Sequence, residues 1–188
     1  MLEGTFGEGG KMAKRPHGLV IVNTGKGKGK STSAFGLALR AVGQGLRVYL
    51  IQFIKGAWQT GEAEAFKRLA PELELRVDLG DGFTWITKDP GQDRRTSQEI
   101  WKLGREAIFS GKYAMVILDE INVAISLGHL ETGEVIAALR ERDPSIHVVL
   151  TGRGASEELI AFADLVSEMR PVKHPFDAGI SAQKGIEF

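Results

Sequence analysis

The stretch LVIVNTGKGKGKST, residues 19–32, decides the fold of this chain. Its apolar start predicts a buried strand, the run of glycines and lysines predicts a tight loop, and the residues that follow have the apolar spacing of a helix. This order of strand, loop and helix is the context that a phosphate-binding P-loop requires. Gly29, Lys30 and Ser31 supply the end of that motif, whereas Thr24 stands where a glycine is usual.

Each part of this loop has a physical role in holding phosphate. Glycines let backbone N–H groups converge on phosphate oxygens, the helix N-terminus adds positive potential, and Lys30 adds a full charge. Ser31 is the expected hydroxyl ligand of Mg²⁺. A solvated surface turn is the alternative, which the preceding apolar strand disfavours, and Lys26 and Lys28 either contact phosphate or are solvated. The expected nucleotide-binding residues of the loop are Thr24, Gly25, Lys26, Gly27, Lys28, Gly29, Lys30, Ser31 and Thr32.

A second apolar run ends in two carboxylates. Residues 114–120, AMVILDE, place Asp119 and Glu120 directly after a predicted strand. A P-loop needs an acid at the end of a buried strand to hold its metal, so Asp119 is the expected Mg²⁺ ligand, and Glu120 either binds the metal or positions a water. Adjacent residues of a strand point to opposite faces, so we expect only one of the two to face the metal directly. A helix-capping acid is the alternative interpretation.

Two arginines are added to the expected ATP-binding set. Residues 151–154, TGRG, close another apolar run, and ligands of open α/β sheets bind beyond the carboxyl ends of the strands, which places Arg153 near phosphate or base. A plain turn arginine is the alternative there. Arg40 belongs to residues 9–61, which contain lysines and arginines but no acidic residue in a chain of zero net charge. This uneven charge indicates a local anion site and not a coat for nucleic acid.

Short β-branched runs alternate with helix-period segments along the chain. The expected strands are 18–23, 47–53, 74–78, 115–119, 147–151 and 165–169, and the expected helices are 30–44, 62–69, 94–110, 132–142 and 156–162. The alternation predicts an α/β fold of the P-loop NTPase type, with a mostly parallel sheet and helices on both faces. The glycine-rich residues 1–16 are expected to form a flexible N-terminal arm, so the domain spans 17–188. Within it, the aperiodic residues 170–188 are either disordered or wrapped around the domain surface.

The composition limits the classes of function. A length of 188 residues suits one domain. The absence of cysteine excludes disulfides, thiolate metal sites and cysteine nucleophiles, and it fits a reducing cytosol. No apolar run is long enough to cross a bilayer, and no apolar stretch follows the basic residues of the N-terminus. We therefore expect a cytoplasmic protein that binds neither a membrane nor nucleic acid.

An aromatic loop is expected between the third strand and the helix that follows it. Residues 80–87, GDGFTWIT, place Phe83 and Trp85 between glycines and threonines. Such side chains either plug the local core or form an apolar wall for a large flat ligand, and Trp58 is a candidate for the same wall. A simple phosphate-transferring enzyme has no obvious use for such a wall.

These segments together resemble the P-loop family of ATP:corrinoid adenosyltransferases. The likeness runs from about residue 18 to the last residue, and the aromatic loop and the C-terminal segment are more specific than the P-loop itself. The matching segments are TGKGKGKST (24–32), AFGLALRAVGQG (34–45), QFIKG (52–56), GFTW (82–85), VILDE (116–120), TGRG (151–154) and VSEMRPVKHPFDAGISAQKGIEF (166–188).

The resemblance implies a reaction and roles for several residues. In this family a corrinoid cobalt, reduced to Co(I), attacks the 5′ carbon of ATP and releases inorganic triphosphate, so the P-loop holds the leaving group. By resemblance, Lys30 and Ser31 contact the triphosphate and Mg²⁺, Glu120 lies at the metal, and Phe83 and Trp85 press on the lower face of the corrinoid. The resemblance also implies an ordered C-terminal segment, a homodimer, and an electron-donating flavoprotein reductase as a partner.

Two departures from the family pattern qualify this interpretation. Lys26 stands where many members have asparagine, and residues 1–16 are shorter than the N-terminal helix that covers a partner's active site in some members. The competing hypothesis is a hydrolytic ATPase switch that acts on a protein or nucleic-acid partner, with Glu120 orienting a water. It leaves the aromatic loop and the C-terminal segment unexplained. A small-molecule kinase is a third hypothesis, for which the sequence offers no obvious acceptor site.

Overall fold

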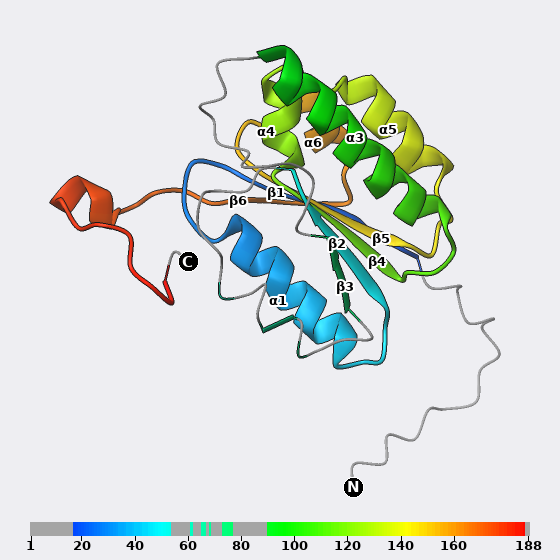
Figure 1. Ribbon diagram of the computed structural model, residues 1–188, viewed down its shortest axis with the longest axis horizontal. Helices are drawn as coiled ribbons and strands as arrows, with labels where there is room; N and C mark the ends of the chain where they lie inside the picture. Colours follow the sequence, from blue (N-terminus) through cyan, green and yellow to red (C-terminus); the bar gives the residue numbers. More distant parts are fainter. Residues whose placement is uncertain are drawn as a thin grey trace, which may run out of the picture.

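Six strands form one sheet in the order β3-β2-β4-β5-β1-β6, and the strand pairs of the described residues are parallel (Figure 1). The structure is a computed structural model that describes residues 17–53, 61, 65, 66, 68, 73–76 and 90–186. The strands are β1 (Val20–Thr24), β2 (Val48–Gln52), β3 (Leu73–Arg76), β4 (Met115–Asp119), β5 (His147–Thr151) and β6 (Leu165–Glu168). The helices are α1 (Lys30–Val42), α3 (Pro90–Phe109), α4 (Ile121–Ser126), α5 (Thr132–Glu141), α6 (Glu157–Phe162) and the 3₁₀ turn η1 (Pro175–Ala178).

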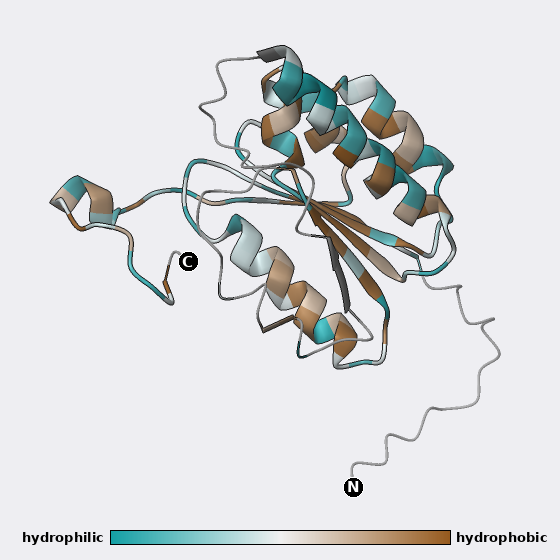
Figure 2. Cartoon of the chain, viewed as in Figure 1, coloured by the Kyte–Doolittle hydropathy of each residue, from teal (hydrophilic) through white to brown (hydrophobic). Residues whose placement is uncertain are grey.

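Helices cover both faces of the sheet. Helix α1 lies on one face, and α3, α4, α5 and α6 lie on the other (Figure 1). Side chains of a strand alternate between the two faces of the sheet, and alternate residues of β1, β2, β4 and β5 pack in two separate hydrophobic cores. In β4, Ile117 packs with Phe35 of α1, whereas Leu118 packs in the core that contains Trp101 of α3. In Figure 2 the central strands of the sheet are mainly brown, the colour of hydrophobic residues. The predicted α/β fold is confirmed.

The expected elements agree with the structure over most of the described chain. Strands β4 and β5 have the predicted bounds, the starts of α1, α5 and β6 and the end of α6 also match, and the remaining ends differ by one to four residues. Helix α3 begins at Pro90 and not at residue 94, because proline is tolerated in a first helical turn whose N–H groups have no intrahelical partner. Most of the expected helix 62–69 lies outside the described residues.

The sequence pattern does not predict helix α4, residues 121–126. Its six residues, INVAIS, follow β4 after Glu120, and the first five are buried, so this short run is not distinguishable by its pattern from a continued strand. In the part of the chain that the structure describes, no helix is long and apolar enough to cross a membrane.

The C-terminal segment leaves the sheet after β6. It runs away from the helical layers and includes η1 (Figure 1). From Arg170 to Ile186 its residues are exposed, apart from the half-buried His174. His174 caps η1, because its Nδ1 accepts a hydrogen bond of 3.2 Å from the N–H of Phe176.

Candidate functional site

The P-loop joins β1 to α1 at the carboxyl edge of the sheet. Gly29 is the N-cap of α1 and has a φ of 107°, a conformation that L side chains rarely adopt. Lys30 is therefore the first residue of the helix, where the N–H groups of the first turn point away from the helix. The loop and the helix N-terminus together form the kind of concave N–H surface that binds phosphate.

The Lys30 side chain is buried within the loop. Its exposed fraction is 7%, and its Nζ donates a hydrogen bond of 2.6 Å to the carbonyl of Gly27. Burial lowers the pKa of Lys30, and the negative charge of Glu120 partly opposes that shift. A buried ammonium that faces a loop built for anions is a strong candidate for a phosphate contact.

The loop packs directly on the start of the C-terminal segment. The N–H of Gly27 donates to the carbonyl of Met169 at 2.6 Å, and the N–H of Met169 donates to the carbonyl of Thr24 at 2.8 Å. A Cβ at Gly25 would lie 2.5 Å from the Met169 carbonyl oxygen, and a Cβ at Gly27 would lie 2.8 Å from the backbone of Met169 and Arg170. Glycine at both positions therefore allows the loop backbone to approach the backbone of Met169 closely, and it also allows the loop to curve.

Asp119 ends β4 and is held by two neighbouring strands. Its Oδ1 accepts a hydrogen bond of 2.6 Å from the Thr151 hydroxyl at the end of β5, and its Oδ2 accepts one of 3.0 Å from the Gln52 amide at the end of β2. The side chain is 2% exposed. Because these strands are parallel and in register, their polar ends form one row along the carboxyl edge of the sheet.

Glu120 turns away from the strand direction. It has a φ of 64°, the only positive φ of a non-glycine residue in the described chain, and its N–H donates to the Thr151 hydroxyl at 2.9 Å. Burial is the main cause that raises the pKa of Glu120, the charge of Asp119 adds to it, and the charge of Lys30 opposes it. A strained backbone and a raised carboxyl pKa at the same residue are typical of functional sites.

The remaining predicted site residues divide into three groups. Arg153 is exposed beside the loop, and its charge acts on both Lys30 and Glu120. Lys26, Lys28 and Thr32 are exposed on the loop and the first turn of α1. Phe83, Trp85 and Trp58 lie outside the described residues.

Arg40 does not lie at this site. It is an exposed residue in the last turn of α1, and a helix that rises 1.5 Å per residue places it about 15 Å from Lys30 along the axis. The expectation that it binds ATP is not supported by this position. ATP binding by Arg40 therefore stays a prediction, because closeness in sequence along a helix is not closeness to its N-terminus.

The comparison with known proteins identifies the family. The model of a family described as ATP:corrinoid adenosyltransferase BtuR/CobO/CobP matches residues 16–188. The chain belongs to this family. A corrinoid adenosyltransferase of Sinorhizobium sp. is 47% identical over 91% of this chain and 80% of its own length. Proteins of the same description from Pseudomonas aeruginosa and Escherichia coli K12 are 46% and 42% identical over 94% of this chain, and over 86% and 88% of their own lengths.

The oxygen donors at the site suit Mg²⁺. Within the described residues, no cluster of three or more His, Cys, Asp or Glu side chains is placed to hold a metal ion. Mg²⁺ does not need such a cluster, because it keeps several waters and binds through one or two carboxylates together with substrate phosphates. The hydroxyl of Ser31 and the carboxylates of Asp119 and Glu120 form a donor set of that kind. The residues present therefore fit this ion.

Glu120→Gln is expected to raise the melting temperature of the ligand-free protein. The pKa of Glu120 in the folded state is above its ordinary value of 4.5. The folded state therefore loses stability as the pH rises from 4.5 to this folded-state pKa. Above that pKa the free-energy cost of burying the charged carboxylate is fully present. Glutamine removes this cost. The gain should amount to a few degrees at pH 8 and be smaller near pH 4.5, as measured by thermal unfolding at both values.

The control for this prediction is Glu106→Gln, which changes an exposed glutamate of α3 and should leave the melting temperature nearly unchanged at both pH values. A loss of stability in Glu120→Gln at pH 8 would contradict the proposed electrostatic cost at this residue.

Several residues that shape the site were given no role from the sequence. Gln52 and Thr151 fix Asp119, and Asn122 donates a hydrogen bond of 3.3 Å to the carbonyl of Gly152. The Asn122 Oδ1 is buried without a hydrogen-bond partner among the described residues. Gln52 and Thr151 lie in the segments QFIKG and TGRG that carry the family resemblance, whereas Asn122 lies outside those segments.

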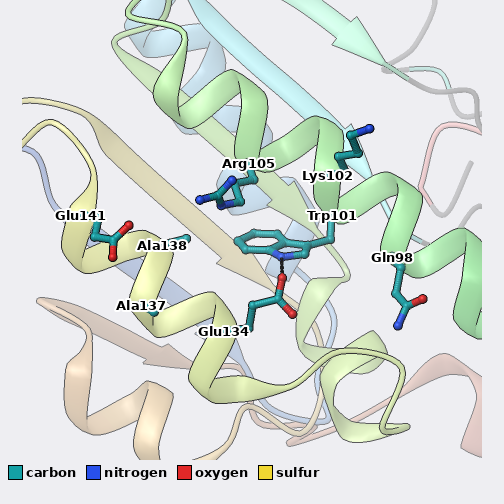
Figure 3. A pocket seen from close by; sticks show the side chains of 8 residues that line it. All are labelled: Gln98, Trp101, Lys102, Arg105, Glu134, Ala137, Ala138 and Glu141. Atoms are coloured by element: carbon teal, nitrogen blue, oxygen red, sulfur yellow. Dashed lines mark hydrogen bonds between the residues drawn. The ribbon is translucent and has the colours of Figure 1, made fainter.

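A groove between α3 and α5 lies apart from the P-loop. Its volume is about 540 Å³, and Figure 3 shows the indole of Trp101 between the two helices. The Trp101 Nε1 donates a hydrogen bond of 2.7 Å to the Glu134 carboxylate, drawn as a dashed line. The indole is only 3% exposed and its N–H is satisfied, so this pair joins the two helices.

Proposed function

We propose that the protein transfers the 5′-deoxyadenosyl group of ATP to the Co(I) centre of a corrinoid and releases inorganic triphosphate. The observation that supports this most is the buried Lys30 within an N–H-lined loop, facing Glu120 at the carboxyl edge of the sheet. Such a site suits a polyphosphate with its cation. The curated relatives in the same family are named as corrinoid adenosyltransferases, which indicates what receives the adenosyl group.

The reaction balances with these two substrates alone. The electron pair of Co(I) forms a bond to C5′ of ATP while the bond between C5′ and its oxygen breaks, and the electrons of that bond leave with triphosphate. No protein nucleophile is required, so a chain without cysteine can catalyse it. The protein supplies position and electrostatic stabilisation of the charge that develops on the leaving oxygen.

The described residues of the site have separate roles in the proposed adenosyl transfer. Lys30 and the loop N–H groups bind the triphosphate oxygens and stabilise the leaving group, and Arg153, whose charge acts on Lys30 and Glu120, adds positive charge. Ser31, Asp119 and Glu120 would hold Mg²⁺, which supplies positive charge to the phosphate oxygens. The contacts of Asp119 with Thr151 and Gln52 keep its carboxylate in place before ATP arrives. Binding an anion near Lys30 would also offset the cost of its burial.

The remaining parts of the hypothesis rest on the family. Phe83 and Trp85 are proposed to contact the lower face of the corrinoid, which favours a cobalt without its lower ligand and eases its reduction. We also propose a flavoprotein reductase as the electron donor, a cytoplasmic location, a homodimer, and an arm of residues 1–16 separate from the domain of residues 17–188.

Trp85→Ala is expected to reduce activity at least about tenfold more with cob(II)alamin plus a reductant than with chemically preformed cob(I)alamin. The reason is that the proposed contact acts on the reduction step, which preformed cob(I)alamin bypasses. Initial rates with the two corrinoid forms measure this difference. Equal losses with both would remove the lower-face role of Trp85.

The products of ATP test the proposed function. With a reduced corrinoid, ATP labelled on its terminal phosphate should yield labelled triphosphate, which ion-exchange chromatography separates from phosphate. The hydrolytic ATPase switch requires labelled phosphate together with ADP. Because the named relatives are adenosyltransferases, this alternative is not favoured, and phosphate as the main product would restore it.

A further inference from the structure

Arg153 lies in a short turn between strand β5 and helix α6 (Figure 1). We call residues 152–155 the Arg153 turn. The two glycines that flank Arg153 have φ values of 126° and 72°, which L side chains rarely adopt. Arg153 itself is exposed, and its charge acts on Lys30 and Glu120. The path of this turn therefore decides where the arginine charge lies relative to the P-loop.

Helix α4, which follows the neighbouring strand β4, supports the Arg153 turn. The Asn122 Nδ2 donates a hydrogen bond of 3.3 Å to the carbonyl of Gly152, and Asn122 is 0% exposed. A Cβ at Gly152 would lie 3.1 Å from both the Asn122 Cβ and the Glu120 Oε2. The turn therefore lies directly against α4, the helix whose N-cap is Glu120.

Strand β1, the other neighbour of β5 in the sheet, supports the same turn. The Thr24 Oγ1 accepts a hydrogen bond of 3.3 Å from the N–H of Ala155. The N–H of Gly152 donates a hydrogen bond of 3.1 Å to the carbonyl of Asn23. Residues of β1 and α4 thus hold the backbone on both sides of Arg153.

The contact with Ala155 gives a role to the threonine at the P-loop position where a glycine is usual. Glu120 is the only non-glycine residue of the described chain with a positive φ, so the backbone at Thr24 does not need glycine. The left-handed conformation comes one residue later, at Gly25, where φ is 96°. The Thr24 hydroxyl, which a glycine would lack, is 8% exposed as part of the whole residue and contacts the Arg153 turn.

We propose that Thr24 and Asn122 are positioning residues, which hold the Arg153 turn so that the arginine charge is in place for the triphosphate before ATP binds. A charge that is already in place needs no reorganisation when negative charge develops on the leaving group. This inference rests on the proposed function for the role of Arg153 at the triphosphate, and it adds the residues that direct that charge.

The test measures binding of inorganic triphosphate with Mg²⁺ by isothermal titration calorimetry of the full chain, which requires no corrinoid. Thr24→Val keeps the shape of the side chain and the backbone contacts but removes the hydroxyl, so it should weaken binding about fivefold. Thr24→Ser keeps the hydroxyl and should bind within about twofold of the wild type. Arg153→Ala should weaken binding at least about tenfold, the effect of losing a charged hydrogen-bond donor.

A double-mutant cycle decides whether Thr24 acts through Arg153. The chain with both Thr24→Val and Arg153→Ala should bind triphosphate within about twofold of Arg153→Ala alone, because the charge to be positioned is already absent. A structural role of Thr24 within the P-loop would instead multiply the two losses to about 50-fold, and that result would overturn the proposal.

Asn122→Leu tests the second support with a side chain of similar size. It should weaken triphosphate binding several-fold in the wild type and have little effect in Arg153→Ala, and it keeps the proposal testable if Thr24→Val does not fold. Thr96→Val is the matched control, because Thr96 is a 4% exposed threonine of α3 whose hydroxyl donates to the carbonyl of Gln92 at 3.2 Å. It should leave triphosphate binding unchanged.

The outcomes separate this proposal from the proposed function. Wild-type affinity in both Thr24→Val and Asn122→Leu, or an equal loss in Thr24→Val and Thr24→Ser, would overturn the positioning role and leave the proposed reaction intact. Wild-type affinity in Arg153→Ala would overturn the positioning role together with the proposed role of Arg153. If the binding results are as expected but ATP yields ADP and phosphate, the positioning role is supported and only the proposed reaction is wrong.

Discussion

Lys30→Ala should reduce kcat/KM at least about 10³-fold while the protein stays folded. The Lys30 ammonium is the buried positive charge of the P-loop, and alanine removes it from the place where triphosphate charge develops. The melting temperature of the ligand-free variant should be no lower than that of the wild type at pH 7. The lowered pKa of Lys30 shows that the folded protein bears a cost for its charged form, mainly through burial.

Steady-state rates and thermal unfolding on the same preparation test this prediction. Lys102→Ala is the control, because Lys102 is an exposed lysine of α3 and its loss should leave kcat/KM within about twofold of the wild type. Full activity in Lys30→Ala would remove the phosphate-loop assignment. A large fall in the melting temperature would instead assign Lys30 a structural role.

Gly25→Ala is expected to lower the stability by about 2–4 kcal/mol and the melting temperature by roughly 5–15 °C. Gly25 has a φ of 96°, and a Cβ there would meet the carbonyl oxygen of Met169 at 2.5 Å and its N atom at 2.8 Å. Backbone atoms cannot move aside as a flexible side chain can. The loop and the end of β6 must separate, which also disrupts the loop's N–H surface and should weaken ATP binding at least about tenfold.

Gly36→Ala provides the matched control within the same helix–loop unit. Gly36 lies exposed in the middle of α1, and a Cβ there meets no atom within 4 Å. Alanine should stabilise the helix by about 0.5–1 kcal/mol. Thermal unfolding and ATP binding of the two variants can be measured together. Equal effects would show that the contact between Gly25 and Met169 is not what requires glycine.

The fold was predictable from the sequence where the hydrophobic pattern of a segment matches its burial in the folded protein. β4 and β5 are buried on both faces, so each is a continuous apolar run, and their predicted bounds match the structure. Helix α4 could not be predicted, because its start depends on the left-handed backbone of Glu120, which no local preference for glutamate indicates.

Only part of the site was predictable from the sequence, because some of its contacts depend on the order of strands in the sheet. Lys30, Asp119 and Glu120 follow apolar strands in recognisable motifs, and the structure brings their charges close enough to shift the pKa values of Lys30 and Glu120. The contact of Met169 with the loop depends on the placement of β6 beside β1, which is a property of strand order. ATP binding by Arg40 stays a prediction, which rests on charge and which the position of Arg40 in the last turn of α1 does not support.

The most direct test of the proposed reaction is an anaerobic absorption spectrum of the protein with chemically reduced cob(I)alamin and ATP with Mg²⁺. We expect the Co(I) absorbance to decay to that of a light-sensitive alkylcobalamin, at a rate that Lys30→Ala reduces at least about 10³-fold. Co(I) absorbance that persists while ATP is converted to ADP and phosphate would contradict adenosyl transfer and would assign this P-loop to hydrolysis.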